Sequence, residues 1–370
     1  MKISEFCLLN GTSLKKNEGK EGYLYLDTAN ITNGVIDSFQ KYGFYEELPS
    51  RARRKVSNNS IVYSTVRPNQ QHFGIITEPP DNLIVSTGFC VIDVDEKIAD
   101  PRYVYYYLSQ SSITKKLHAI AEQATTAYPS IKAKDLGDLE IDLPDLDRQH
   151  EVAQILTSLD KKILLNSAIN DNLQQQAEAA YSKLMDEAGN CTQVPLKDIA
   201  HITMGQSPAG HSCSENAAGT VFYQGRAEFG FRFPTRRLFT TEPKRMAKSG
   251  DVLLSVRAPV GDINIAYEEC CIGRGLSAIE SKTGESSFLL YTFRYFGRQF
   301  EVFNAEGTVF GSINKEQLNN FQIKLPPKEK IKEFEAIVRP MDDLIRMNFT
   351  ENDRLTELRE KLLLNFFNGK

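Results

Sequence analysis

A fifteen-residue phrase occurs twice in the chain, and each copy stands directly before a long polar segment. Residues 130–144 read SIKAKDLGDLEIDLP and residues 312–326 read SINKEQLNNFQIKLP, an offset of 182 positions between Ser130 and Ser312. Self-similarity at a fixed offset indicates that one supersecondary unit has been duplicated. The phrase therefore constrains the fold more strongly than any other feature of the sequence.

The same offset continues downstream, where Glu151 aligns with Glu333 and Asp160 with Asp342. Upstream, STVRP at 64–68 resembles LSVRAP at 254–259, and STGF at 86–89 aligns with GRGL at 273–276. The offset rises slightly in this direction, which requires only short insertions or deletions. We therefore expect two units, each a mixed domain followed by a helix.

The segments after the two phrases carry seam residues at alternating spacings of four and three. In the first segment these are Val152, Leu156, Leu159, Ile163, Asn166, Asn170, Leu173, Ala177, Ala180 and Leu184. In the second they are Phe334, Val338, Met341, Ile345, Asn348, Asn352, Leu355, Arg359, Leu362 and Phe366. Heptads sustained this long predict a coiled coil, here of helices of about 40 residues and roughly 60 Å.

Two asparagines interrupt each seam at the same place. If the helices pair antiparallel with facing positions that sum to 518, Asn166 meets Asn352 and Asn170 meets Asn348. Buried asparagine pairs lower stability but fix register, since a slip would leave their amides against apolar side chains. The same register sets Arg359 opposite an apolar position, where we expect its guanidinium to reach solvent. The alternative is two unrelated surface helices with exposed asparagines.

These patterns predict an α+β fold with two mixed α/β domains related by pseudo-two-fold symmetry. The domains would be separated by two long helices that form an antiparallel coiled coil. We expect the first domain at 1–145, a central helix at 146–190, the second domain at 191–326 and a C-terminal helix at 327–370. DNA-binding dimers use a two-fold axis in this way to read spaced half-sites. Because the two domains differ in sequence, their half-sites should differ too.

Composition excludes several classes of protein. No run approaches the roughly 18 apolar residues of a membrane span, and the first residues lack a secretory signal, so we expect a cytoplasmic protein. The six cysteines form no CxxC pair, which favours reduced thiols over disulfides. His211 and Cys213 have no second ligand pair nearby, so no metal site is expected.

The net charge of −4 gives no overall signature of a nucleic-acid partner. Any DNA surface must therefore be a local patch. Two stretches are candidates, RARRK at 51–55 and the arginine-rich residues 225–245. The alternative for either stretch alone is a solvated surface loop.

At this point the chain resembles a known family over nearly its whole length, the specificity (S) subunits of type I restriction-modification enzymes. The resemblance rests on VPLKDIAHITMGQSP at 194–208, GDVLLSVRAPVGD at 250–262 and the two repeated phrases. It implies that each domain is a target recognition domain and that the helices are spacers that also bind methyltransferase (M) subunits. Such a protein reads double-stranded DNA at an asymmetric, bipartite sequence with a nonspecific gap. Two M subunits would methylate an adenine in each half, and restriction (R) subunits would join for cleavage.

Side-chain chemistry narrows the choice of DNA-binding residues, because Arg reads guanine, Gln and Asn read adenine, and Lys mostly contacts phosphate. In the first domain we expect DNA binding by Arg51, Arg53, Arg54, Lys55, Arg67, Gln70 and His72. In the second we expect it by Gln206, Gln224, Arg226, Arg232, Arg236, Arg237, Arg257 and Arg274. Arg67 and Arg257 follow corresponding strand-like runs and rank above the rest. The alternative for both is a fold-stabilising ion pair.

Other functional classes find little support in the sequence. An adenine methyltransferase would need a glycine-rich cofactor loop and an Asn/Asp-Pro-Pro-aromatic motif, and the Pro-Pro pairs at 78–81 and 325–328 do not fit. No clustered carboxylates suggest a nuclease site. We therefore expect a non-catalytic subunit without catalytic residues or a cofactor. A two-domain scaffold that binds other proteins is the remaining alternative.

Overall fold

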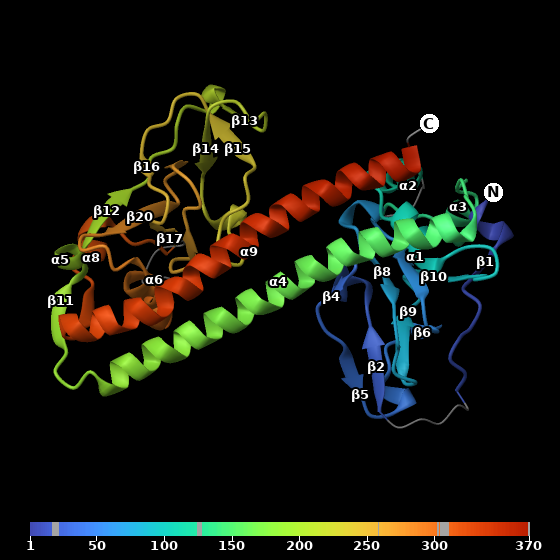
Figure 1. Ribbon diagram of the computed structural model, residues 1–370, viewed down its shortest axis with the longest axis horizontal. Coiled ribbons are helices and arrows are strands. Elements are labelled where there is room, and N and C mark those ends of the chain that lie inside the picture. The colour runs from blue at the N-terminus through green and yellow to red at the C-terminus, as the bar shows by residue number, and fades with distance from the viewer. Residues whose placement is uncertain (17–21, 124–127, 258, 302, 304–310, 369–370) are drawn as a thin grey trace. The chain divides into compact units, whose positions relative to one another are not determined.

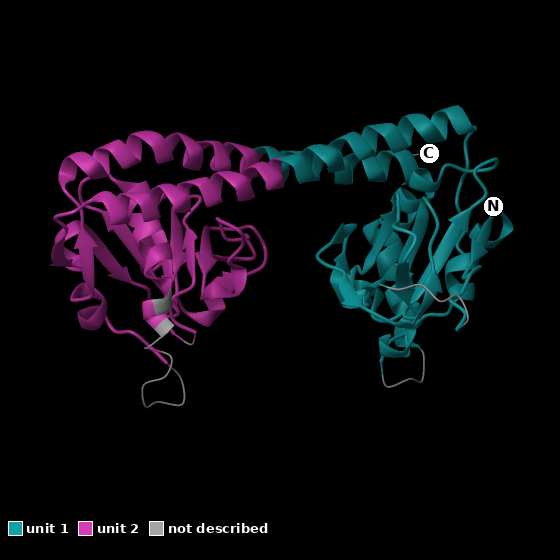
Figure 2. Ribbon diagram, turned by 90° about the horizontal axis from the view of Figure 1, so that it is seen from below, with its two compact units in different colours: residues 1–165, 351–370 teal, residues 166–350 magenta. Residues whose placement is uncertain are grey.

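The computed structural model describes all of the chain except residues 17–21, 124–127, 258, 302, 304–310 and 369–370 (Figure 1). The chain divides into two compact units (Figure 2). Unit 1 contains Met1–Leu165 and Glu351–Lys370, and unit 2 contains Asn166–Thr350. Each unit therefore combines one mixed domain with a segment of each long helix. None of the helices in the described residues has the length and apolar character needed to cross a bilayer.

Two four-stranded sheets form the domain of unit 1. The antiparallel sheet has the order β1 (Cys7–Leu9), β10 (Phe89–Val94), β7 (Ser60–Ser64), β8 (Phe73–Ile76). The mixed sheet has the order β5 (Gln40–Tyr42), β2 (Tyr23–Leu26), β9 (Leu83–Ser86), β6 (Ala52–Lys55), with β2 and β9 parallel. The domain also contains the hairpin β3 (Ile31–Thr32) and β4 (Val35–Ile36), and the helices α1 (Pro101–Leu108), α2 (Ser111–Glu122) and α3 (Ala133–Gly137).

The domain of unit 2 has a matching pair of sheets. Its antiparallel sheet has the order β12 (Ala200–Met204), β20 (Leu276–Ser281), β17 (Val252–Ser255), β18 (Ile263–Ile265). Its mixed sheet has the order β13 (Cys213–Ser214), β15 (Leu238–Thr240), β14 (Thr220–Tyr223), β19 (Cys270–Ile272), β16 (Met246–Ala247). A further pair, β11 (Thr192–Pro195) with β21 (Gln322–Leu325), accompanies the helices α5 (Leu196–Ile199), α6 (Ser286–Tyr295) and α8 (Lys315–Asn319).

The two domains share one topology, which confirms the predicted duplication. Strands β5, β2, β9 and β6 correspond to β15, β14, β19 and β16, and in each case only the central pair is parallel. Strands β1, β10, β7 and β8 correspond likewise to β12, β20, β17 and β18. In both units the repeated phrase supplies a bridge, a short helix (α3 or α8) and the entry to a long helix. Among the described strands, β13, the hairpin β3–β4 and the pair β11–β21 have no matching strands in the other unit.

Helices α1 and α6 follow the sheets of the two domains, and their N-termini are stabilised in different ways. In α1, Asp100 accepts from the backbone N–H groups of Arg102 and Tyr103, and Pro101 occupies the first turn, as is usual for a helix start. The cap residue of α6 makes no such bond. There, Glu335 from the C-terminal helix accepts from the N–H of Phe288 at 2.7 Å, and burial raises the pKa of the Glu335 carboxyl. The start of α6 is thus tied to that helix.

The two long helices are α4 (Leu146–Glu187) and α9 (Lys328–Asn368), and their segments pair within each unit. In unit 1, Val152 and Leu156 share an apolar core with Leu363. In unit 2, the ring of Tyr181 packs edge-on against Phe334 at 5.6 Å, and Asn348 donates to the Oδ1 of Asn170 at 2.8 Å. A residue further along α4 contacts a residue earlier in α9, as Asn170 with Asn348 and Tyr181 with Phe334 show. The paired segments therefore run antiparallel.

The Asn170–Asn348 bond is the pairing that a register of 518 predicts. Both amides are buried, so a shift of register would bury unpaired polar groups. Asn352 in unit 1 donates to the carbonyl of Ile163 at 3.4 Å. Asn166 is buried as well. All four asparagines thus lie in the seam or at its margin.

The expectation for Arg359 was wrong, because its guanidinium does not reach solvent. Arg359 is only 6% exposed, pairs with Asp160 at 2.7 Å and lies over the ring of Tyr106 at 5.9 Å. Tyr106 also donates to the Asp160 carboxylate at 2.8 Å. A buried arginine needs such partners to offset the loss of hydration. Asp160 provides one that heptad pairing alone could not reveal.

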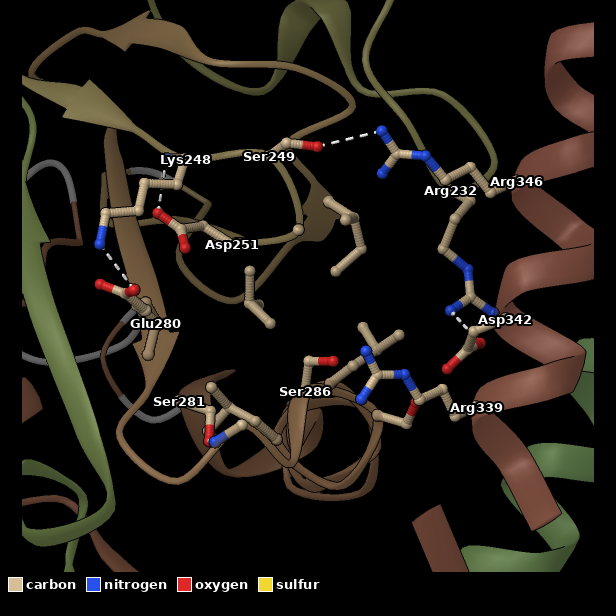
Figure 3. Close-up of a pocket in the computed structure, with 18 of the residues that line it drawn as sticks. Arg232, Lys248, Ser249, Asp251, Glu280, Ser281, Ser286, Arg339, Asp342 and Arg346 are labelled. Atoms are coloured by element: carbon tan, nitrogen blue, oxygen red, sulfur yellow. Dashed lines mark hydrogen bonds and ion pairs between the residues drawn. The ribbon is translucent and has the colours of Figure 1, made fainter. Parts of the chain in front are cut away.

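Unit 2 contains a similar buried cluster of an arginine, an aspartate and a tyrosine, but its arginine comes from a different element. Tyr291 donates to Asp342 at 2.9 Å. Arg232 from the domain donates to the same carboxylate at 3.0 Å (Figure 3). Burial raises the pKa of Tyr106 and of Tyr291, so both phenols remain protonated donors. Asp160 and Asp342 are equivalent in the repeat, and each fastens its domain to a long helix.

Candidate nucleic-acid interface

Three chain segments of the second domain meet at one edge, where β14 and β17 end and β19 turns into β20. Gly273 donates to the carbonyl of Tyr223 at 2.8 Å, and Val256 donates to that of Gly275 at 2.9 Å. A Cβ atom on Gly275 would lie 2.8 Å from the carbonyl oxygen of Gln224. Only glycine allows this close approach, which fixes the shape of the edge.

A concave site of about 320 Å³ opens at this edge. The residues that line it include Gln224, Arg226, Glu228, Arg237 and Arg257. All of these except Glu228 are exposed. Four side chains that were predicted to bind DNA, scattered over 34 residues of sequence (224 to 257), are thereby brought into one basic hollow.

Two more predicted residues lie beside this hollow. The backbone N–H of Gln206 donates to the carbonyl of Ile272 at 2.9 Å, and that of Arg274 donates to Ser207 at 3.3 Å. Both side chains are exposed. Arg236 is exposed too, but it pairs with Glu268 and lies over the ring of Tyr267 at 5.9 Å. It does not line the hollow.

Arg232 lies in the interior and is the clearest correction to the predicted set. Its side chain is only 3% exposed and is bonded to Asp342, Gln174 and the Tyr291 hydroxyl. It borders a separate cleft of about 390 Å³ between the domain and α9 (Figure 3). There basic and acidic side chains pair, as Lys248 does with Glu280 at 2.7 Å. A buried arginine that is bonded to three side chains is not available to DNA, so Arg232 has a structural role.

The corresponding edge of the first domain carries fewer free cations. The N–H of Thr65 donates to the carbonyl of Gly88, and the N–H of Thr87 donates to that of Arg51, both at 2.8 Å. Arg51 and Arg67 therefore flank the turn between β9 and β10, and both side chains are exposed. Arg67 lies over the exposed ring of Tyr128 at 5.0 Å.

The backbone at Arg67 has an unusual conformation. Its φ of 48° lies in the left-handed region, which costs a side-chain-bearing residue energy and is found preferentially at functional sites. Its N–H donates to the carbonyl of Pro129 at 2.9 Å, which holds the turn. The strain therefore supports a functional reading of Arg67.

The predicted correspondence between Arg67 and Arg257 is wrong by one residue. Val66 bridges Ser130, whereas Arg257 bridges Ser312, the equivalent serine of the second repeat. Val66 is therefore the structural counterpart of Arg257. Arg67 stands one position further along the chain.

The remaining candidates of the first domain are largely engaged within the fold. Arg53 donates to the carbonyl of Ala52 at 2.7 Å and lies over the ring of Tyr45 at 5.1 Å. Arg54 and Lys55 are half-buried in β6, and His72 contacts the carbonyl of Ile31 at 2.7 Å. Gln70 is exposed in the short helix η4 (Pro68–Gln70) next to Arg67.

Sequence reasoning missed two residues at these edges, Glu228 and Tyr128. An acidic residue among arginines and a tyrosine in a loop carry no signal for DNA binding by residue type alone. Their roles follow from contacts, Glu228 with Arg237 and Tyr128 with Arg67. As for metals, the described residues hold no group of three or more His, Cys, Asp or Glu suited to an ion, and His211 pairs with Glu242.

Comparisons with known proteins agree with this architecture. The family model "Type I restriction modification DNA specificity domain" matches residues 1–175 and again residues 189–360. The putative type I restriction enzyme MjaX specificity subunit of Methanocaldococcus jannaschii is 29% identical over 98% of this chain and 90% of its own. The HindI specificity subunit of Haemophilus influenzae is 32% identical over 37% of this chain and 30% of its own.

A solved structure is similar in fold over nearly the whole length. The type I restriction-modification S subunit from M. genitalium superposes with a TM-score of 0.64, covering 99% of this chain and 95% of its own at 17% identity. The match extends through both domains and both long helices. With two copies of the specificity domain that span most of its sequence, the chain belongs to the family of type I restriction-modification specificity subunits, which are non-catalytic.

Proposed function

We propose that this subunit reads an asymmetric, bipartite sequence in double-stranded DNA, one half with each domain. The observation that carries the proposal is that the two domains have equivalent edges. In the first domain the edge is built from the end of β2, the turn after β9 and the end of β7. In the second domain it is built from the end of β14, the turn after β19 and the end of β17. Exposed arginine and glutamine side chains collect at both edges. These are the side chains that hydrogen-bond guanine and adenine in the major groove.

The chemistry of the second edge favours DNA over a peptide ligand. Its hollow is lined by three arginines and a glutamine rather than by the apolar pockets typical of peptide recognition. Arg226 pairs with Asp262 at 2.5 Å, which leaves Arg257 without an ion pair among the described residues. A guanidinium of this kind can hold a phosphate or a guanine edge. A protein-interaction scaffold therefore remains the weaker alternative.

The long helices would act as the spacer that sets the gap between the half-sites. Inserting seven residues after Leu165 and seven after Asn352 lengthens both helices at facing positions of the register. A heptad preserves the seam and adds about 10 Å, which corresponds to about three base pairs of DNA. We expect the gap in the methylated sequence to grow by about that much, as determined by sequencing methylated adenines in cells that carry the M subunit.

Insertion of the heptad into one helix alone is the control for this experiment. It makes the helix pairings on the two sides of the insertion incompatible, so the Asn170–Asn348 bond and the Asp160–Arg359 ion pair cannot form together, and binding should be lost rather than respaced. A gap that stays unchanged when both helices are lengthened would contradict the spacer role. A peptide-binding scaffold would show no dependence of any DNA sequence on helix length.

We further propose that two M subunits dock on equivalent apolar positions of the helices, with R subunits joining the assembly. Leu165 on α4 and Met347 on α9 are related by the offset of 182, and they are 57% and 67% exposed. Ile337 and Leu344 are also exposed and lie on the same face of α9 as Met347, given spacings of seven and three. Exposed apolar positions repeated in this way mark protein interaction sites.

Charge placed in either position should remove one M subunit. We expect Leu165→Glu and Met347→Glu each to reduce the complex from two M subunits to one, and the double variant to bind none. Native mass spectrometry of the purified complex measures this stoichiometry. Leu8→Glu on β1, another exposed leucine, is the matched control and should keep both subunits. Full stoichiometry in the double variant would refute this docking surface.

A further inference from the structure

We propose that Glu228 is a positioning residue that holds Arg237 in the orientation needed to read a guanine in the half-site of the second domain. The inference rests on the proposed function, and it assigns a role to an acidic residue in an otherwise basic hollow. Glu228 lies in the short helix η6 (Arg226–Glu228), and Arg237 lies just before β15. Both line the hollow of about 320 Å³.

The two side chains differ sharply in exposure. The Glu228 side chain is 3% exposed, whereas that of Arg237 is 55% exposed. Nε and Nη2 of Arg237 both donate to the Oε1 of Glu228, at 3.2 and 2.5 Å. The other oxygen, Oε2, is enclosed and has no hydrogen-bond partner among the described residues. A buried carboxylate depends strongly on its single cationic partner, so the arginine is held in place.

The backbone around the pair is fixed as well. The N–H of Thr235 donates to the carbonyl of Glu228 at 2.8 Å, which closes the loop between the two residues. The neighbouring N–H of Phe229 donates to the carbonyl of Arg226 at 3.0 Å. Both ends of the Glu228–Arg237 contact thus start from a constrained chain. Pre-organisation of this kind lowers the entropy lost when a side chain is ordered on binding.

The geometry leaves one edge of the guanidinium available. Arginine has five N–H donors arranged in a fork, and Glu228 occupies the edge formed by Nε and Nη2. Nη1 has no hydrogen-bond partner within the described part of the chain. The Nη1/Nη2 edge of an exposed arginine can donate to O6 and N7 of guanine, which is the commonest specific contact to a base.

The buried carboxylate also argues for a base rather than a phosphate as the ligand of Arg237. Glu228 largely neutralises the arginine, and a second anion nearby would be repelled by the Glu228 charge. A guanine edge is uncharged and presents only acceptors, so it suits a neutralised but oriented donor pair. Arg257, which has no ion pair among the described residues, is better suited to phosphate.

The test compares variants of the full subunit in complex with M subunits by selection of bound duplexes from a randomised pool. Arg237→Ala should relax one guanine position in the half-site of the second domain, with a loss of discrimination on the order of tenfold or more. Glu228→Gln keeps the size of the side chain but removes the charge, and it should relax the same position. The other half-site should not change in either variant.

A double variant separates positioning from stability. Arg237→Ala alone leaves the buried Glu228 carboxylate without its cation. The double variant Glu228→Gln with Arg237→Gln leaves no buried, unpaired charge, so the melting temperature of the double variant should lie closer to that of the original protein. Its base preference should nevertheless stay relaxed at that one position. The matched control is Glu280→Gln, which removes one charge of the exposed ion pair between Glu280 and Lys248 in the same domain. It should leave the selected sequence of both half-sites unchanged.

Each outcome bears on one conclusion. If Arg237→Ala relaxes a position and Glu228→Gln does not, Glu228 only stabilises the fold and the inference is overturned. An unchanged sequence with Arg237→Ala also overturns it, while the proposed function stands as long as defined half-sites are still selected. If the original complex selects no defined sequence at all, the proposed function itself fails.

Discussion

Exchanging residues 191–326 for the corresponding domain of a relative is expected to replace one half of the recognised sequence completely and leave the other half intact. The expectation follows from the organisation of the chain. The sheets, the basic hollow and the apolar core of the second domain all lie within Asn166–Thr350, and the first domain has separate cores of its own. No residue of the first edge is part of the second hollow.

The readout is the set of methylated adenines in cells that carry the hybrid subunit and the M subunit. The junctions fall just after α4 and between β21 and α9, so both long helices keep their own sequence and register. Exchange of residues 1–145 is the reciprocal control, and it should alter the other half only. If either exchange altered both halves, the two domains would not be independent readers.

Sequence periodicity was most informative where contacts are local or repeated. The heptads and the paired asparagines predicted the antiparallel seam, including the bond between Asn170 and Asn348. The repeated phrase predicted two equivalent domains, and their shared strand order bears this out. The order itself was not predictable, because the parallel pairs β2–β9 and β14–β19 join strands that are far apart in the chain.

The candidate site was predicted less well, because burial depends on distant partners. Arg232 and Arg237 belong to one stretch, FRFPTRR, and residue type alone cannot distinguish them. Arg232 is buried and pairs with Asp342, 110 positions later in the chain. Arg237 pairs with Glu228, nine positions before it, and stays half exposed. Arg359 shows the same limit, since its partner Asp160 belongs to the other helix.

The contrast between these two arginines leads to a second large effect, this time on stability. Arg232→Met is expected to destabilise unit 2 by about 3–5 kcal/mol, because it leaves Asp342 poorly solvated beside Tyr291 without its cation. For a unit of this size that corresponds to a fall in melting temperature on the order of 10 °C. Calorimetry of the purified subunit measures it.

Two further variants show that the effect comes from the broken pair. Arg232→Met combined with Asp342→Leu removes both charges, and we expect it to recover most of the lost stability. Arg236→Gln breaks the exposed pair with Glu268 and should change stability by no more than about 0.5 kcal/mol.

The same variants also test the assignment of Arg232 to the fold rather than to DNA. In cells grown at a temperature where the double variant is folded, the methylated sequence should be identical to that of the original protein. A guanidinium that is 3% exposed and bonded to three side chains has no exposed donor to offer a base edge. Normal stability together with an altered half-site would instead place Arg232 among the residues that read DNA.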